Sequence, residues 1–235
     1  LRDSTDAEGI ERWLRVRVED VGLRRFGPRP QPAVGLQLAQ LAFRFGFFAR
    51  EQARRTSEGW RIRHVEWKPE KSVALDVSAD EAPMPLRGMI DRIDVRERPD
   101  GNGNEWAILD YKTGSSAKDP AKAHRKRSGE WRDLQLPLYT LLARELGLAG
   151  EPALGYFTIG KDEAETGVSI ASWKRADVES ALDAAREVVR RVRRGEFFAL
   201  GRFPDDPILL AIAGKGLVEG AEEEDANEVG VEEAT

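Results

Sequence analysis

Apolar residues in the first part of the chain recur at steps of three and four positions, which is the spacing of one buried helix face. The residues that follow this spacing are Val34, Leu38, Leu41, Phe45 and Phe48. The pattern predicts a helix that continues to about Glu58 and is ended by Gly59. We therefore expect residues 1–60 to be an N-terminal helical segment that packs on the rest of the fold.

A different pattern begins at Arg61, where short segments rich in Ile, Val and Trp alternate with clusters of Pro, Lys or Gly. Such segments are typical of strands. Four successive strands are predicted, over residues 61–67, 71–77, 85–95 and 105–112. The turn-forming sequence Pro-Asp-Gly-Asn-Gly-Asn separates the last two, so those two strands should pair as an antiparallel hairpin.

The pattern returns to helix after Gly114. Helical stretches are predicted over 118–127 and 131–146, strands over 152–160 and 166–173, and an amphipathic helix over 176–194. This order of elements predicts an α/β fold, in which a mixed central sheet is flanked by helices within a core over 61–203. Residues 204–235 have little periodicity, so an irregular region and an acidic, disordered tail are expected there.

The composition excludes several classes of protein. The 235-residue chain has no cysteine, so it holds no disulfide, zinc–thiolate site or cysteine-ligated iron–sulfur cluster. Its mean hydropathy is −0.52 and no apolar run approaches the roughly 18 residues of a membrane-spanning helix, so no membrane partner is expected. The chain opens on Leu1 inside a polar stretch of helical pattern and shows no apolar leader, which predicts a cytoplasmic piece of a longer protein.

The net charge of −5 is unevenly distributed along the chain. Eight acidic residues and no basic residue lie between Glu219 and Glu233, so the rest of the chain carries +3. Arginine, which binds phosphate through two hydrogen bonds, accounts for 28 of the 37 basic residues. A coding bias toward arginine would produce the same excess of arginine over lysine. The charge by itself therefore does not specify a nucleic-acid ligand.

A carboxylate and an ammonium stand together at the end of the fourth predicted strand. Asp110 and Lys112 are two positions apart, so they project from the same side of this strand. The hairpin can bring Asp91 beside Asp110. Two neighbouring carboxylates share a proton or bind a divalent cation, and oxygen ligands suit Mg²⁺ or Mn²⁺. The alternative is an ordinary ion pair of Asp110 with Lys112, with Asp91 bonded to Arg92 or to Asp94 nearby.

Three sequence motifs occur in an order that resembles a known family. They are Gly-Met-Ile-Asp-Arg-Ile-Asp at 88–94, Asp-Tyr-Lys-Thr-Gly at 110–114 and Gln-Leu-Pro-Leu-Tyr at 135–139. Together they resemble the RecB-type nuclease domain of the PD-(D/E)XK superfamily, whose core is restriction-endonuclease-like, over roughly residues 61–195. The upstream helix with Glu-Gly-Trp at 58–60 looks most like AddB-type subunits of helicase–nuclease repair complexes.

This resemblance implies a Mg²⁺-dependent DNA nuclease, with Mn²⁺ as an alternative ion. The catalytic residues that it implies are Asp91, Asp110 and Lys112, and the metal ligands are Asp91, Asp110 and Tyr111. Lys112 would orient the attacking water or stabilise negative charge on the phosphate. The resemblance also implies an exonuclease that works with a helicase partner in double-strand-break repair and recombination. Two alternatives stay open: a DNA-binding or scaffold domain that does not cut, and a stand-alone nuclease of a defence system or mobile element.

Further residues are expected around this site. Gln135 and Tyr139 are four positions apart and Arg132 is three positions before Gln135, so all three are expected on one helix face. The resemblance implies that the face of Gln135 and Tyr139 looks onto the active site and the substrate backbone. For Tyr139, the alternative is a half-buried core aromatic whose hydroxyl finds a partner. The basic residues Lys122 and Arg125 follow the active-site strand and can track a phosphate backbone.

Glu66 matches a glutamate of the family on the preceding strand, and we expect it to support the metal ligands without binding metal itself. His64 and His124 do not have the spacing to the two aspartates that metal ligands show. Each is expected to find hydrogen-bond partners within the fold or to face solvent. Many relatives carry a further metal-binding histidine on an earlier helix. That residue is expected upstream of Leu1, which would leave the coordination shell of this chain incomplete and the isolated chain inactive or only weakly active.

Overall fold

The computed structural model describes residues 2–114 and 118–196. Two long helices come first, α1 (Ala7–Phe26) and α2 (Pro32–Ser57). The carboxylate of Asp6 caps α1 by accepting a hydrogen bond from the Gly9 amide, and a proline opens α2. The predicted helix over 34–58 is therefore confirmed as α2, and the polar stretch before it forms a second helix of its own.

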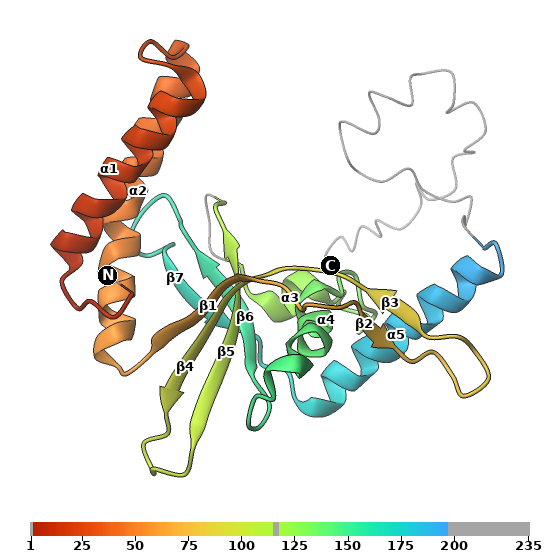
Figure 1. Ribbon diagram of the computed structural model, residues 1–235. Coiled ribbons are helices and arrows are strands. Elements are labelled where there is room, and N and C mark those ends of the chain that lie inside the picture. The colour runs from red at the N-terminus through yellow and green to blue at the C-terminus, as the bar shows by residue number, and fades with distance from the viewer. Residues whose placement is uncertain (1, 115–117, 197–235) are drawn as a thin grey trace, which may run out of the picture. The chain divides into compact units, whose positions relative to one another are not determined.

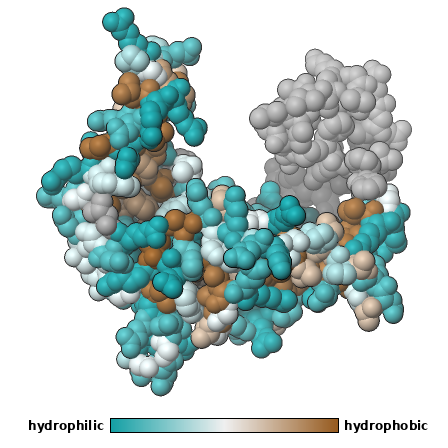
Figure 2. Space-filling model, in the orientation of Figure 1, coloured by the Kyte–Doolittle hydropathy of each residue, from teal (hydrophilic) through white to brown (hydrophobic). Residues whose placement is uncertain are grey.

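The two helices pack on each other through a small apolar cluster, in which Ile10 of α1 meets Ala49 and Ala53 of α2. Small residues on α2 let the helices approach closely. Other large apolar side chains of both helices stay exposed, and Figure 2 shows hydrophobic residues scattered among hydrophilic ones on this part of the molecule. Helix α1 therefore has no single apolar face, which explains why its sequence reads as polar.

The centre of the fold is a five-stranded sheet in the order β1-β4-β5-β6-β7 (Figure 1). The strands are β1 (Arg61–Trp67), β4 (Ile90–Glu97), β5 (Asn104–Lys112), β6 (Ala153–Thr158) and β7 (Gly167–Ile170). Strands β5 and β6 pair in parallel, and the other neighbouring pairs are antiparallel. The predicted α/β class, the mixed sheet and the hairpin of β4 with β5 are thus confirmed.

Two of the predicted strands differ from the structure. The stretch 71–77 contributes only β2 (Val73–Leu75), and 85–95 splits into β3 (Met84–Leu86) and β4. Strands β2 and β3 form a separate two-stranded sheet. The reason is packing: Leu75 joins a buried cluster with residues of the later helices and does not extend the central sheet. Between β3 and β4 the chain passes close to a helix, since a Cβ added at Gly88 would lie 2.7 Å from Leu142 Cδ1.

The remaining helices are α3 (Pro120–His124), α4 (Gln135–Leu142), the 3₁₀-helix η1 (Ala143–Leu146) and α5 (Arg175–Arg193). The prediction of a helix over 131–146 was wrong at its start. The amides of Arg132 and Asp133 donate to the His124 carbonyl, which holds this stretch outside the helix. The carboxylate of Asp133 then accepts a hydrogen bond from the Gln135 amide, where α4 begins.

The two faces of the sheet carry different helices (Figure 1). On one face, Ile108 and Tyr156 pack with Leu136 and Leu142 of α4. On the other face, Phe157 packs against Phe48 of α2, with a distance of 4.8 Å between ring centroids. Each strand residue thus faces either α2 or α4, and the side chains that matter for chemistry divide between these two faces.

Residues Leu1–Val189 form one compact unit, which contains the whole central sheet. Within the described ranges, no helix is long and apolar enough to cross a membrane. The irregular region and acidic tail predicted over 204–235 lie outside the described residues.

Candidate active site

The two aspartates of the predicted site come from neighbouring strands. Strand β4 pairs with β5 so that Arg92 faces Leu109, which places Asp91 next to Asp110. The Oδ2 atom of Asp91 accepts a hydrogen bond of 3.0 Å from the Tyr111 amide. This bond fixes the Asp91 carboxylate across the strand pair, directly beside the second aspartate.

Asp110 is almost fully buried, with 3% of its surface exposed. Its Oδ1 atom accepts hydrogen bonds from Gln135 Nε2 at 2.9 Å and from the Tyr139 hydroxyl at 3.2 Å. Its Oδ2 atom forms an ion pair of 2.6 Å with Lys112 Nζ, so the Asp110–Lys112 pair of the alternative interpretation is present. A buried carboxylate is costly unless it is paired, and the Lys112 ammonium provides the positive charge at this oxygen.

Lys112 is held on two sides at the edge of the site. Its ammonium pairs with Asp110 and lies 4.9 Å from the centre of the Tyr156 ring. A cation over an aromatic face is attracted by the ring quadrupole. The side chain is 38% exposed, so the ammonium can still reach a ligand from solvent.

Tyr156 is positioned by a fully buried histidine. The Nδ1 atom of His124 lies 2.9 Å from the Asp133 carbonyl, which only accepts, so Nδ1 carries the proton. Nε2 then accepts a hydrogen bond of 2.6 Å from the Tyr156 hydroxyl. Burial, with the charges of Asp133 and Asp110, raises the pKa of Tyr156 to about 12, so the hydroxyl keeps its proton. His124 is thus a satisfied core histidine, as predicted.

Gln135 and Tyr139 are the first and fifth residues of α4, and both reach Asp110. Gln135 Nε2 also donates to the Tyr139 hydroxyl at 2.8 Å, which closes a three-residue network. Burial and the charge of Asp110 raise the pKa of Tyr139 above its ordinary value, so this hydroxyl is neutral and donates. The ring of Tyr139 belongs to the core and its hydroxyl has a partner in Asp110, as the alternative interpretation expects, while its contact with substrate stays a prediction.

The basic residues predicted to bind substrate lie in other surroundings. Arg132 precedes α4 and is not on the helix face of Gln135, which corrects the prediction that they share one. The Arg125 guanidinium donates a hydrogen bond of 2.7 Å to Asp177 and lies 4.9 Å from the centre of the Trp131 ring. It is therefore occupied by contacts within the fold. Lys122 on α3 is 89% exposed and lies 3.8 Å from Asp119, so its ammonium is accessible to solvent.

The structure also places Tyr111 and Glu66, the two other residues predicted around the carboxylates. The Tyr111 side chain packs on the α2 face of the sheet and its hydroxyl accepts a hydrogen bond from Arg92 at 3.2 Å, so only its main chain borders the carboxylates. Glu66 is exposed on β1, where the flanking pairs place it opposite Asp91. Its φ of 47° is unusual for a residue with a side chain.

A buried charge cluster behind the site was not anticipated. Arg92 donates two hydrogen bonds to Asp94, at 2.7 and 2.8 Å, and Arg55 of α2 donates a third at 2.9 Å. The interpretation in which Asp91 bonds Arg92 or Asp94 is thereby overturned, because Asp91 bonds the Tyr111 amide instead. The signal was present in the sequence, since Arg92 and Asp94 are two positions apart and share a strand face.

The family model described as the PD-(D/E)XK nuclease superfamily matches residues 2–204. The chain belongs to this superfamily. No curated protein matches the sequence. The members of the PD-(D/E)XK superfamily are nucleases that generally use divalent metal ions. The match begins at residue 2, so it includes both N-terminal helices as well as the stretch that carries the three motifs.

The donor set of this PD-(D/E)XK chain fits a divalent ion in part. Within 2–114 and 118–196, no group of three or more His, Asp or Glu side chains could hold a metal ion. The chain offers two carboxylates, of which Asp110 is buried and pairs with Lys112 through Oδ2. Magnesium often takes only one or two carboxylates and completes its shell with water and substrate phosphate. Asp91 and Asp110 therefore suit an ion that the substrate helps to hold.

Proposed function

We propose that this chain is a Mg²⁺-dependent deoxyribonuclease domain that hydrolyses phosphodiester bonds at Asp91 and Asp110, with Mn²⁺ as an alternative ion. The observation that carries the proposal is the state of Asp110. Its carboxylate is buried, Gln135 and Tyr139 occupy one oxygen, and the other oxygen pairs with the partly exposed Lys112 at the edge of the site. Membership of a nuclease superfamily supports the same activity.

Each residue has a distinct task in this proposal. A bound divalent ion supplies Lewis-acid polarisation of the phosphodiester. Gln135 and Tyr139 orient the Asp110 carboxylate so that Oδ2 is directed to the ligand. The Tyr111 amide orients Asp91 in the same way, and the Tyr111 main-chain carbonyl is the third ligand that we propose. The Lys112 ammonium orients the attacking water or offsets negative charge on the phosphoryl oxygens.

The wider assignments are supported by the order of the three motifs and by the upstream helix with Glu-Gly-Trp at 58–60. We propose a RecB-type exonuclease of the AddB class that acts with a helicase partner in double-strand-break repair and recombination in the cytoplasm. The exposed side chains of Lys122 and Arg132 are its proposed contacts to the DNA backbone. Glu66, opposite Asp91 on β1, supports the ligand strand, and its unusual φ is of the kind found at functional sites.

The proposal is tested by incubating the purified chain with labelled linear and circular DNA in Mg²⁺, Mn²⁺ or a chelator. We expect cleavage only with metal, and degradation of linear DNA without circular DNA if the enzyme is an exonuclease. Asp110→Asn keeps the shape of the side chain and removes its charge, so it should abolish cleavage while circular dichroism shows the parent fold. A chain that binds DNA but never cuts it with either ion would instead be a silent DNA-binding domain.

A further inference from the structure

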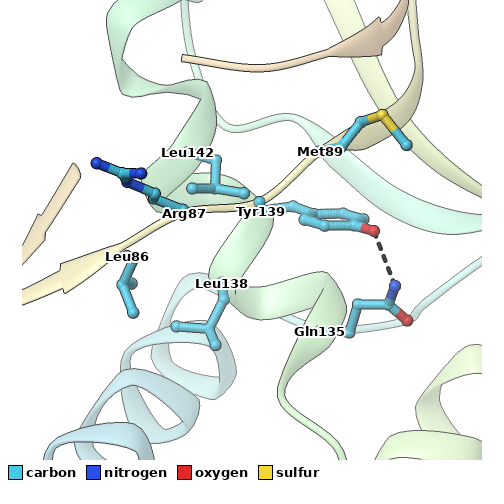
Figure 3. Close-up of a pocket in the computed structure, with 8 residues that line it drawn as sticks. Leu86, Arg87, Met89, Gln135, Leu138, Tyr139 and Leu142 are labelled. Atoms are coloured by element: carbon cyan, nitrogen blue, oxygen red, sulfur yellow. Dashed lines mark hydrogen bonds between the residues drawn. The ribbon is translucent and has the colours of Figure 1, made fainter. Parts of the chain in front are cut away.

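A hollow of about 280 Å³ lies beside the carboxylates, between α4 and the stretch of chain from Leu86 to Met89 (Figure 3). Its walls are formed mainly by apolar side chains, among them Met89, Leu138 and Leu142. Tyr139, which Figure 3 shows among them, is only 6% exposed, so it offers little ring surface to a ligand. The hollow is therefore mainly an apolar slot.

One end of the slot is the active site itself. Gln135 and Tyr139 line the slot, and both donate hydrogen bonds to Asp110 Oδ1. A phosphate bound at Asp91 and Asp110 would thus place the adjoining part of the nucleic acid at the mouth of the slot. Figure 3 shows the Tyr139 hydroxyl and the Gln135 amide at one end, and Arg87 at the other.

The polar groups at the two ends differ in chemistry. The Gln135 amide nitrogen is used by Asp110 and Tyr139, but its carbonyl oxygen accepts no hydrogen bond from the described residues, so it can accept one from a ligand. Arg87 is exposed and forms no ion pair within the described part of the chain. Arginine in this state readily binds phosphate through two hydrogen bonds.

We propose that this slot is a subsite for one unpaired nucleobase next to the scissile phosphate, with Arg87 on the following phosphate. The inference rests on the proposed function and adds the site at which one nucleotide of the substrate binds. A base has apolar faces and a polar edge, which match the Met89 and Leu138 side chains and the Gln135 carbonyl. Apolar contact with the face of a base tolerates any base, because each has such a face.

The size of the slot supports a single base. Pockets for drug-sized ligands begin at roughly 300 Å³, and the slot is slightly smaller than that. A base that is paired and stacked in a duplex cannot enter, so the nucleotide must be unpaired or flipped out before it binds.

The test uses single-stranded oligonucleotides in which one abasic nucleotide is moved along the sequence. For the 235-residue chain with Mg²⁺ or Mn²⁺, we expect kcat/KM at the neighbouring phosphodiester to fall about 10-fold at one abasic position, because the apolar contacts of that base are lost. Abasic sites at other positions should have little effect. The expected loss appears mainly in KM, since the chemistry at Asp110 is untouched.

The two methionines of the chain provide a matched pair of variants. Met89 lines the slot and is 37% exposed, whereas Met84 is 39% exposed and lies outside it. Met89→Ala and Arg87→Ala should raise KM, and Met84→Ala and Arg25→Ala should not. The increases in KM caused by the abasic nucleotide and by Met89→Ala should be less than additive when the two are combined, because both remove the same contact.

Several results would overturn the subsite and leave the nuclease assignment standing. They are cleavage that is insensitive to every abasic position, or equal KM values for the Met89→Ala and Met84→Ala chains. If the parent chain does not cut DNA with either ion, the proposed function fails. Fluorescence anisotropy of the same oligonucleotides in chelator then decides the subsite, since equal affinities for normal and abasic strands would overturn it as well.

Discussion

Asp110 has two oxygens with different surroundings, and this asymmetry determines what the neighbouring residues can do. Gln135 and Tyr139 occupy Oδ1, so the buried Oδ2 faces Lys112 and any incoming cation. Lys112 in turn rests on Tyr156, whose hydroxyl is bonded to His124. At the scale of single residues, the site is therefore a carboxylate held by an amide and a hydroxyl, and an ammonium held against the face of an aromatic ring.

Replacing Lys112 by methionine tests its task at this scale. The variant keeps much of the side-chain length and removes the charge, so kcat should fall by about 10²- to 10³-fold, the usual loss when one group that stabilises transition-state charge is removed. KM should change less, and cleavage rates on linear DNA at saturating substrate provide the measurement. Lys68→Met, an exposed lysine just after β1, is the control. A Lys112→Met chain that cuts at the parental kcat would exclude a catalytic task for this ammonium.

At the scale of secondary-structure elements, α2 is attached to the sheet by buried charges. Arg55 of α2 and Arg92 of β4 share the Asp94 carboxylate, whose side chain is fully buried. Arg92 also donates to the Tyr111 hydroxyl, which belongs to the active-site strand β5. The helix, β4 and β5 are thereby fixed in one arrangement, and the strands that carry Asp91 and Asp110 keep their register.

Asp94→Ala should destabilise this arrangement strongly. It leaves Arg55 and Arg92 buried without their common counter-charge, and breaking a buried pair from one side costs about 3–5 kcal/mol. Urea denaturation followed by circular dichroism measures the free energy of unfolding. The control is Glu105→Ala, which removes a more exposed pair with Arg96 and should cost about 1 kcal/mol or less. Equal losses for the two variants would contradict the view that the Asp94 cluster holds α2 to the sheet.

At the scale of the whole molecule, the two tyrosines of the α4 face make stability depend on alkaline pH. Burial raises the pKa of Tyr156 to about 12, and it raises that of Tyr139 as well. In the unfolded chain both hydroxyls ionise near pH 10. Their contribution is therefore complete below about pH 10 and is lost as the pH rises through the folded values, because only the unfolded state releases these protons early.

We expect the free energy of unfolding to decline between about pH 10 and 12, measured by urea denaturation across this range. Tyr156→Phe should be less stable than the parent at neutral pH, because it leaves the buried His124 Nε2 without its donor. The same variant should also show a shallower alkaline decline, since one of the two titrating hydroxyls is gone. A decline as steep as that of the parent would mean that Tyr156 does not contribute to it.

Much of the site could be predicted from spacing along the chain. The alternation of a strand puts Asp110 and Lys112 on one side, and the turn sequence at 99–104 makes β4 and β5 a hairpin that brings Asp91 to them. The four-residue step from Gln135 to Tyr139 likewise puts both on one face of α4. These relations are local, so the sequence by itself determined them.

Only the tertiary structure decided which partners these residues find. In the sequence, Arg132 and Arg125 are both basic residues near the site. The structure separates them, because the Arg132 amide donates to the His124 carbonyl and lies outside α4, whereas the Arg125 guanidinium donates to Asp177. The apolar stretch with Leu75 leaves the central sheet because it packs beneath the helices. The slot beside Tyr139 is lined by Gly88 and Leu142, where the chain passes close to the helix. Spacing fixes the face on which a side chain stands, whereas the group opposite it depends on contacts between segments far apart in the sequence.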